Sequence, residues 1–215
     1  MEQETQTRKK DVTVKLNGHP VQLTNQEKIY WPEDEITKGE LVAYYPEVAD
    51  VLLPHLKDRP LSLHRFPNGI NGVSFYQKDL DLKTSPDWLK TVPILASSTG
   101  KVVDYLVCNN AATLAYMANL GCIELNPWLS RTSKLDNPDY IVLDLDPEGI
   151  SFKYVIETAL CIHEILEEME VKSYVKTSGS SGIHIYIPVA AKYEYEVCRF
   201  LRSMWLRKRT HECQR

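Results

Sequence analysis

One short stretch, residues 139–147, constrains the fold more than any other because it places two acids at the end of an apolar strand. It reads Asp-Tyr-Ile-Val-Leu-Asp-Leu-Asp-Pro. Side chains alternate along a strand, so Asp144 and Asp146 share one face, while the leucines beside them share the other. Neighbouring carboxylates repel each other unless a cation lies between them, and Mg²⁺ or Mn²⁺ suits oxygen ligands. The stretch predicts a metal site; the alternative is that one Asp caps the helix expected from Ser151 and the other faces water.

A second informative stretch, residues 176–188, reads Lys-Thr-Ser-Gly-Ser-Ser-Gly-Ile-His-Ile-Tyr-Ile-Pro. The small polar loop 178–182 joins two expected strands, and its backbone N–H groups are suited to form an anion-binding concavity for phosphate. His184 alternates with isoleucines on the second strand, which is also typical of a structural histidine. Ser–His nucleophilic catalysis is less favoured, because the chain contains no G-x-S-x-G elbow.

The bulk properties exclude several classes of protein. The 215 residues are 43% hydrophobic and 25% charged, and the formal net charge is -4, so a nucleic-acid surface would have to be a local basic patch. The five cysteines form no C-x-x-C pair, which argues against a zinc site and a disulfide framework. The N-terminus lacks the apolar region of a signal peptide, and no apolar run reaches membrane-spanning length. We therefore expect a cytoplasmic protein without a membrane partner.

The order of local signals predicts an α+β fold with a mostly antiparallel sheet flanked by helices. Asn17-Gly18 between two alternating apolar segments indicates a hairpin, and Thr37 with Glu40 forms a capping box at the start of a helix. Residues 24–31 are expected to be a connecting segment. Further strands are expected near 61–66, 73–78, 91–96, 101–107, 122–126, 174–177 and 183–188, and further helices near 110–120, 151–170 and from 193. No firm domain boundary is indicated.

Residues 141–147 and 176–188 together resemble the primase-polymerase domain of bacterial ligase D, an archaeo-eukaryotic primase superfamily domain that acts in non-homologous end joining. The resemblance runs from about Val12 to Tyr195 and includes residues 23–32, 65–69, 75–78 and 121–128. It implies a primase-polymerase fold with a central sheet. It also implies that residues 1–10 form a flexible tail, 11–195 the domain, and 196–215 a basic tail.

The resemblance implies a role for each candidate in nucleotide binding. Asp144 and Asp146 would hold two divalent ions, Mn²⁺ or Mg²⁺, between a nucleoside triphosphate and the primer 3′ oxygen. Ser178 and His184 match residues that contact the triphosphate, and Ser180 and Asn126 are further nucleotide-binding candidates. Asn126 stands where many members have His, and Ser181 stands where several have Lys, so two sources of positive charge are lost.

The same resemblance implies a DNA-binding set. Lys28 and Lys38 match two lysines that hold the 5′-phosphate at a DNA break; the alternative is that both are solvated surface lysines. Phe75 and Tyr76 match an aromatic pair that stacks on template bases, although one of them could belong to the core, since neighbours on a strand face opposite ways. Arg65 completes the DNA-binding candidates.

The chain departs from the family after Tyr195. Two-metal chemistry of this kind needs a third carboxylate, which lies in the family well beyond the serine–histidine motif, and we find no equivalent. We expect nucleotide binding to survive and catalysis to be weak or absent. The basic residues after 196 could bind nucleic acid electrostatically, but we interpret this segment as a truncated or frame-altered terminus.

The expected reaction is the template-directed addition of nucleotides, with ribonucleotides preferred over deoxyribonucleotides, to a 3′ end at a DNA break. Expected partners are DNA ends with a 5′-phosphate, a primer-template, NTPs or dNTPs, a Ku-type protein and an ATP-dependent DNA ligase, in the bacterial cytoplasm at the nucleoid. Two alternatives remain: a non-catalytic module that binds DNA ends and nucleotides, and a D-x-D nucleotide-sugar transferase that uses one metal.

Overall fold

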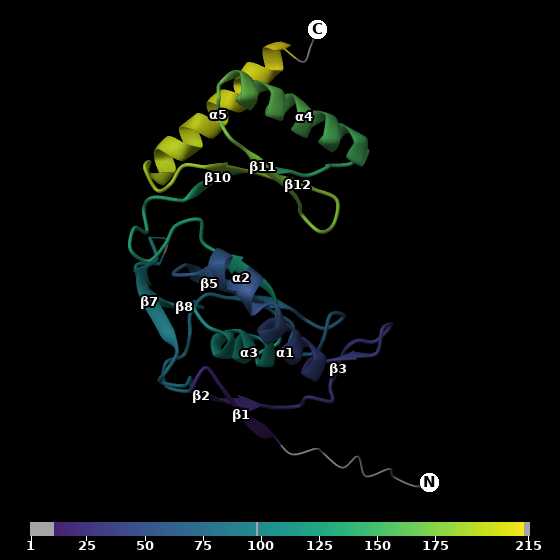
Figure 1. The fold of residues 1–215 in the computed structure, drawn as a ribbon, viewed down its shortest axis with the longest axis vertical. Helices are drawn as coiled ribbons and strands as arrows, with labels where there is room; N and C mark the ends of the chain where they lie inside the picture. Colours follow the sequence, from purple (N-terminus) through teal and green to yellow (C-terminus); the bar gives the residue numbers. More distant parts are fainter. Residues whose placement is uncertain (1–10, 98, 213–215) are drawn as a thin grey trace. The chain divides into compact units, whose positions relative to one another are not determined.

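A computed structural model describes residues 11–97 and 99–212, and the predicted tail 1–10 lies outside them (Figure 1). The chain divides into two compact units, Met1–Trp128 and Leu129–Arg215. Sequence signals did not indicate this division. No helix in the described ranges is both long and apolar enough to cross a membrane.

The first unit begins with the predicted hairpin, formed by β1 (Val12–Leu16) and β2 (His19–Leu23). The two strands pair in register from Val12↔Leu23 to Leu16↔His19. Asn17 and Gly18 have φ values of 46° and 83°, and these positive angles are what a two-residue type I′ turn requires. The hairpin prediction is therefore confirmed.

Strand β5 (Pro60–Arg65) organises the five-stranded sheet of this unit by pairing antiparallel with β6 (Phe75–Gln77), β8 (Val102–Val107) and β9 (Cys122–Pro127). Strand β7 (Lys90–Leu95) extends the sheet from β8. Leu61 and Leu63 of β5 are fully buried in the core of the unit, and Ser62 and His64 alternate with them. One face of β5 is thus apolar and the other is polar.

Helices α1 (Lys38–Glu47), α2 (Ala49–Leu56) and α3 (Ala111–Asn119) pack into the same core. The predicted capping box is present: Thr37 Oγ1 accepts a hydrogen bond from the Glu40 backbone (3.2 Å), and Glu40 Oε2 accepts one from the Thr37 backbone (2.7 Å). We expected residues 24–31 to be only a connecting segment. Strand β3 (Ile29–Trp31) lies within it and pairs with β4 (Ile36–Thr37).

The second unit is a three-stranded antiparallel sheet in the order β10 (Tyr140–Leu145), β12 (Ile183–Pro188) and β11 (Tyr174–Thr177). Helices α4 (Phe152–Glu168) and α5 (Tyr195–Glu212) lie on the same side of this sheet (Figure 1). Its apolar face packs against them, and each fully buried aliphatic side chain there contributes about 1.5–3 kcal/mol. The core members are Ile141, Leu143, Val155, Ile162, Leu166, Ile183, Ile185, Ile187 and Cys198.

All strand pairings within the described ranges are antiparallel, and the predicted α+β class is confirmed. The two larger sheets belong to different units. Helix α5 runs through most of the segment that we interpreted from the sequence as a tail.

The capping box gives a test of the first unit. Replacing Thr37 by Ala removes the acceptor for the Glu40 amide, so the free energy of unfolding should fall by about 1 kcal/mol in urea denaturation. Thr37→Ser keeps the hydroxyl and should stay close to wild type. Equal losses for the two variants would contradict the assigned cap.

Candidate functional site

The face of the second sheet that points away from α4 and α5 carries a row of three polar side chains. Asp144 on β10 lies directly opposite His184 on β12, which in turn lies opposite Lys176 on β11. His184 Nε2 lies 3.2 Å from Asp144 Oδ1. The carboxylate only accepts hydrogen bonds, so Nε2 carries the proton that is donated to Asp144. This contact fixes the orientation of the His184 ring, with Nδ1 on the side away from Asp144. Asp144 and His184 therefore share one face of this sheet.

Asp146 follows β10 and lies beside the small polar loop. A methyl group at Gly182 would overlap with Asp146 Oδ1, and it would lie 3.0 Å from Ser178 Oγ. Gly182 therefore lets the Asp146 carboxylate approach the backbone of the loop beside the Ser178 hydroxyl. The structure brings together Asp144 and His184 on the strands, and Asp146 and Ser178 around Gly182.

The hydrogen bonds of the loop change the predicted anion site. Ser178 Oγ accepts the backbone N–H groups of Gly182 (2.9 Å) and Ser180 (3.5 Å), and the Ser178 amide donates to the Gly182 carbonyl (2.9 Å). These three amides thus serve the loop itself rather than an open concavity. Because the Ser178 oxygen already accepts two bonds, its hydroxyl proton is left to donate outward. Of the two serines, Ser178 therefore has a hydroxyl proton that could be donated to a phosphate. Ser180 takes part in the loop through its backbone amide, which donates to Ser178 Oγ.

The acids fit a hard divalent ion in part. Asp144 is 59% exposed, so its carboxylate remains accessible, and Asp146 supplies a second carboxylate. Such ions accept water and phosphate oxygens beside one or two protein carboxylates. No cluster of three or more His, Cys, Asp or Glu side chains suited to a metal occurs among residues 11–97 and 99–203. A third carboxylate is therefore not found within that part of the chain.

The two candidate lysines of the first unit are neighbours. The Lys38 amide donates to the Lys28 carbonyl (2.8 Å). Lys38 is only 4% exposed, and its Nζ donates to the Thr24 carbonyl (2.6 Å). Burial lowers the pKa of Lys38 to about 8, and the positive charges of Lys28 and Arg65 act in the same direction. Lys38 is therefore not a solvated surface lysine.

Lys28 is held by neutral groups. Its Nζ donates to the Pro67 carbonyl and to Asn68 Oδ1, both at 2.6 Å. Both lysines are held by neutral oxygens, and the charges of Lys28 and Arg65 act on Lys38 against that of Asp11, so positive charge gathers at this point. Such a point attracts an anion.

The aromatic candidates both lie on the surface. Phe75 is 44% exposed and Tyr76 is 60% exposed, so the possibility that one belongs to the core is wrong. Strand β6 is at the edge of its sheet, so one of its backbone edges is not paired with another described strand. Arg65 lies opposite Phe75, with its guanidinium carbon 5.2 Å from the ring centre. Arg65 also donates to the Leu120 carbonyl and to Gln77, so it is tied to its own unit.

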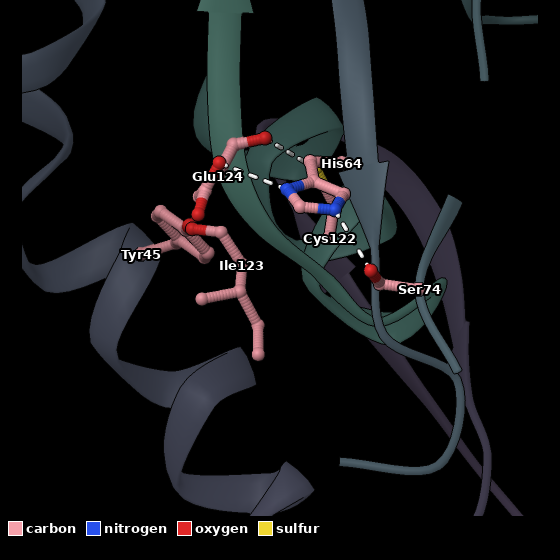
Figure 2. A network of polar contacts seen from close by, with 6 residues as sticks. All are labelled: Tyr45, His64, Ser74, Cys122, Ile123 and Glu124. Atoms are coloured by element: carbon pink, nitrogen blue, oxygen red, sulfur yellow. Dashed lines mark hydrogen bonds and ion pairs between the residues drawn. The ribbon is translucent and has the colours of Figure 1, made fainter. Parts of the chain in front are cut away.

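Asn126 is exposed on β9, opposite Ser62 of β5. Sequence reasoning missed its neighbours on the same face, His64 and Glu124. Figure 2 shows the His64 ring between Glu124 and Ser74, with contacts of 2.9 Å at Nδ1 and 3.0 Å at Nε2. The available signal was the alternation of polar Ser62 and His64 with apolar residues along β5.

The chain is similar to known proteins in sequence and in structure. The family model for the LigD primase-polymerase domain matches residues 37–212. The chain is 32% identical over 173 residues to the multifunctional non-homologous end joining protein LigD of Mycolicibacterium smegmatis, covering 79% of this chain and 22% of that protein. It is 32% identical over 185 residues to the bifunctional LigD of Bacillus subtilis, covering 84% of this chain and 29% of that protein.

A solved structure is also similar. It is the polymerase domain of Mycobacterium tuberculosis ligase D in complex with DNA, which superposes with a TM-score of 0.67 at 30% identity and covers 79% of this chain and 61% of that one. The chain thus spans 22% and 29% of the two full-length relatives above.

The position of Gly182 generates a test of the acidic site. In Gly182→Ala the methyl group displaces the flexible Asp146 carboxylate, so Mn²⁺ affinity measured by calorimetry should fall by about 10–100-fold, with little change in urea stability. Ser181→Ala, one residue away in the same loop, is the matched control and should bind Mn²⁺ like wild type. An unchanged Mn²⁺ affinity in Gly182→Ala would show that the Asp146 carboxylate does not bind the metal ion.

Proposed function

Because this chain belongs to the LigD primase-polymerase domain family, we propose that it is a nucleotidyltransferase acting at DNA breaks in non-homologous end joining. It adds nucleotides, with ribonucleotides preferred, to a 3′ end paired with a template. The observation that carries the proposal is the convergence of Asp144 and His184 with Asp146 and Ser178 on neighbouring strands and one loop.

Asp144 and Asp146 would hold the divalent ions, Mn²⁺ or Mg²⁺, which when bound neutralise the charge of the triphosphate and of the attacking 3′ oxygen. The Ser178 hydroxyl donates to a phosphate oxygen, since its own oxygen is satisfied by the loop amides. His184 lies beside Asp144 on the neighbouring strand, with its Nε2 3.2 Å from Asp144 Oδ1, and would line the triphosphate site. Lys176 adds a positive charge to the same row.

Lys28 and Lys38 bind the 5′-phosphate of the DNA end. The proposal is supported by the burial of Lys38 beside a second cation, since a phosphate would compensate both charges. Phe75 and Tyr76 stack on template bases, because both rings are exposed on an edge strand. A Ku-type protein and an ATP-dependent DNA ligase are the proposed partners, and the nucleoid in the cytoplasm is the proposed location.

A second candidate function is a non-catalytic module that binds nucleotides and DNA ends. It is favoured by one observation: residues 11–97 and 99–203 contain no group of three or more His, Cys, Asp or Glu side chains that could hold a metal ion. The family assignment speaks against the nucleotide-sugar transferase, which shares only the D-x-D sequence.

Primer extension separates the two candidates. On a gapped duplex with a 5′-phosphate, NTPs and Mn²⁺, the wild-type chain should extend the primer weakly, as expected of a site with two of the three carboxylates, and Asp144→Ala should abolish this extension. Glu148→Ala removes a nearby exposed acid and should leave extension unchanged. If the wild-type chain binds the gapped duplex but does not extend the primer at all, the polymerase proposal is wrong and the non-catalytic module is favoured.

The buried lysine predicts a pH dependence of end binding. Lys38 is charged below its pKa of about 8 and neutral above it, so the preference for 5′-phosphate over 5′-hydroxyl ends should fall by about tenfold from about pH 7 to about pH 9. Fluorescence anisotropy with the two DNAs measures this preference. Lys38→Arg keeps the charge and should remove the pH dependence, whereas a preference in wild type that does not change with pH would contradict the assignment.

The pH dependence of the free energy of unfolding gives an independent check of the lowered pKa of Lys38. Lys38 has a folded pKa below its unfolded value of about 10.4, so between about pH 8 and that value the unfolded chain binds more protons. The free energy of unfolding contributed by this site should therefore rise with pH across that window. Lys38→Met should not show the rise.

A further inference from the structure

Tyr76 rests on a histidine that sequence reasoning left unassigned. His64 on β5 lies directly opposite Tyr76 on β6, with ring centroids 4.2 Å apart and planes 10° from parallel. Tyr76 is nevertheless 60% exposed. The imidazole therefore covers one face of the phenol ring, while the rest of the ring remains accessible.

His64 is itself held on several sides. Its Nδ1 lies 2.9 Å from Glu124 Oε2 and its Nε2 lies 3.0 Å from Ser74 Oγ (Figure 2). The Phe66 ring lies 4.4 Å from the His64 ring, centre to centre. Because the Glu124 carboxylate accepts only, Nδ1 is the donor, and hydrogen bonds at both nitrogens stop the imidazole from turning about its side-chain axis.

The support matters because β6 has little else to fix it. The strand has three residues, and among residues 11–97 and 99–212 it pairs with β5 alone, at the edge of its sheet. A stack with a fixed ring limits the rotamers of Tyr76 before any ligand arrives, and pre-organisation of this kind reduces the entropy lost on binding. On the opposite face of β6, Arg65 supports Phe75 in a corresponding way.

We infer that His64, clamped by Glu124 and Ser74, is a positioning residue that holds Tyr76 as a stacking platform for an unpaired nucleobase of the template. This inference rests on the proposed function, because it assumes that Tyr76 meets single-stranded template. A base on the outer side of the ring would complete a stack of base, phenol and imidazole. Since every base has a π-face, the platform serves any template sequence.

A double-mutant cycle tests whether His64 acts through Tyr76. Affinity for a duplex with a single-stranded template overhang is measured by anisotropy for wild type, His64→Ala, Tyr76→Ala and the double variant. We expect Tyr76→Ala to weaken binding by about 5–100-fold and His64→Ala by about threefold to tenfold. We expect the double variant to match Tyr76→Ala alone, because His64 has nothing left to position. Additive losses would overturn the inference.

Two further measurements separate positioning from a general structural role. His64→Phe keeps a stacked ring but loses the hydrogen bonds to Glu124 and Ser74, so it should restore only part of the affinity lost in His64→Ala. The Tyr76 ring protons, observed by NMR in ¹³C-tyrosine protein and assigned with Tyr76→Phe, should shift in His64→Ala without DNA. Unchanged ring shifts would overturn the inference whatever the binding result.

The same binding measurements distinguish a failure of the proposed template binding from a failure of the positioning role of His64. A wild-type chain that binds the overhang no better than a blunt duplex would overturn the proposed template binding and, with it, the role of His64. A wild-type chain that prefers the overhang, with losses from His64 and Tyr76 that add, would overturn only the positioning role.

Discussion

The register of the antiparallel pair β10–β12 is the constraint on which the candidate nucleotide site depends. It sets Asp144 opposite His184, and the isoleucines and leucines of the same strands face the helices. A slip of one residue would bury the acid and expose the aliphatic side chains, so the apolar core enforces the position of the polar row. The same pairing ends beside Gly182, where the absence of a side chain lets Asp146 reach the Ser178 loop.

Cross-strand pairing also builds the surface of the first unit. Strand β5 has partners on both sides, and consecutive residues His64 and Arg65 each support one aromatic residue of β6. The alternation that buries Leu63 presents His64 to Glu124 on β9. Cations cluster where the start of α1 meets the segment before β3, so Lys38 is buried close to Lys28. Each proposed contact with DNA therefore follows from backbone pairing.

Local signals predicted the parts of the structure that depend on near neighbours. The Asn17-Gly18 turn, the Thr37 cap and the faces of the D-x-D strand are all fixed within a few residues. The sequence could not show the burial of Lys38, because its acceptor Thr24 lies 14 residues away, or the His64–Glu124 contact, which joins residues 60 apart. The sequence predicted that the amides of the loop 178–182 would be open to an anion. It did not show that the Ser178 hydroxyl oxygen accepts the Ser180 and Gly182 amides.

The most direct measurement of the central claim is paramagnetic broadening of backbone amide signals by Mn²⁺ in the presence of a nonhydrolysable nucleotide. If Asp144, Asp146, Ser178 and His184 form one site for a metal-bound triphosphate, broadening should be strongest at residues 144–146 and 178–184 and should vanish in Asp144→Ala. Broadening centred elsewhere, or unchanged in that variant, would contradict the account.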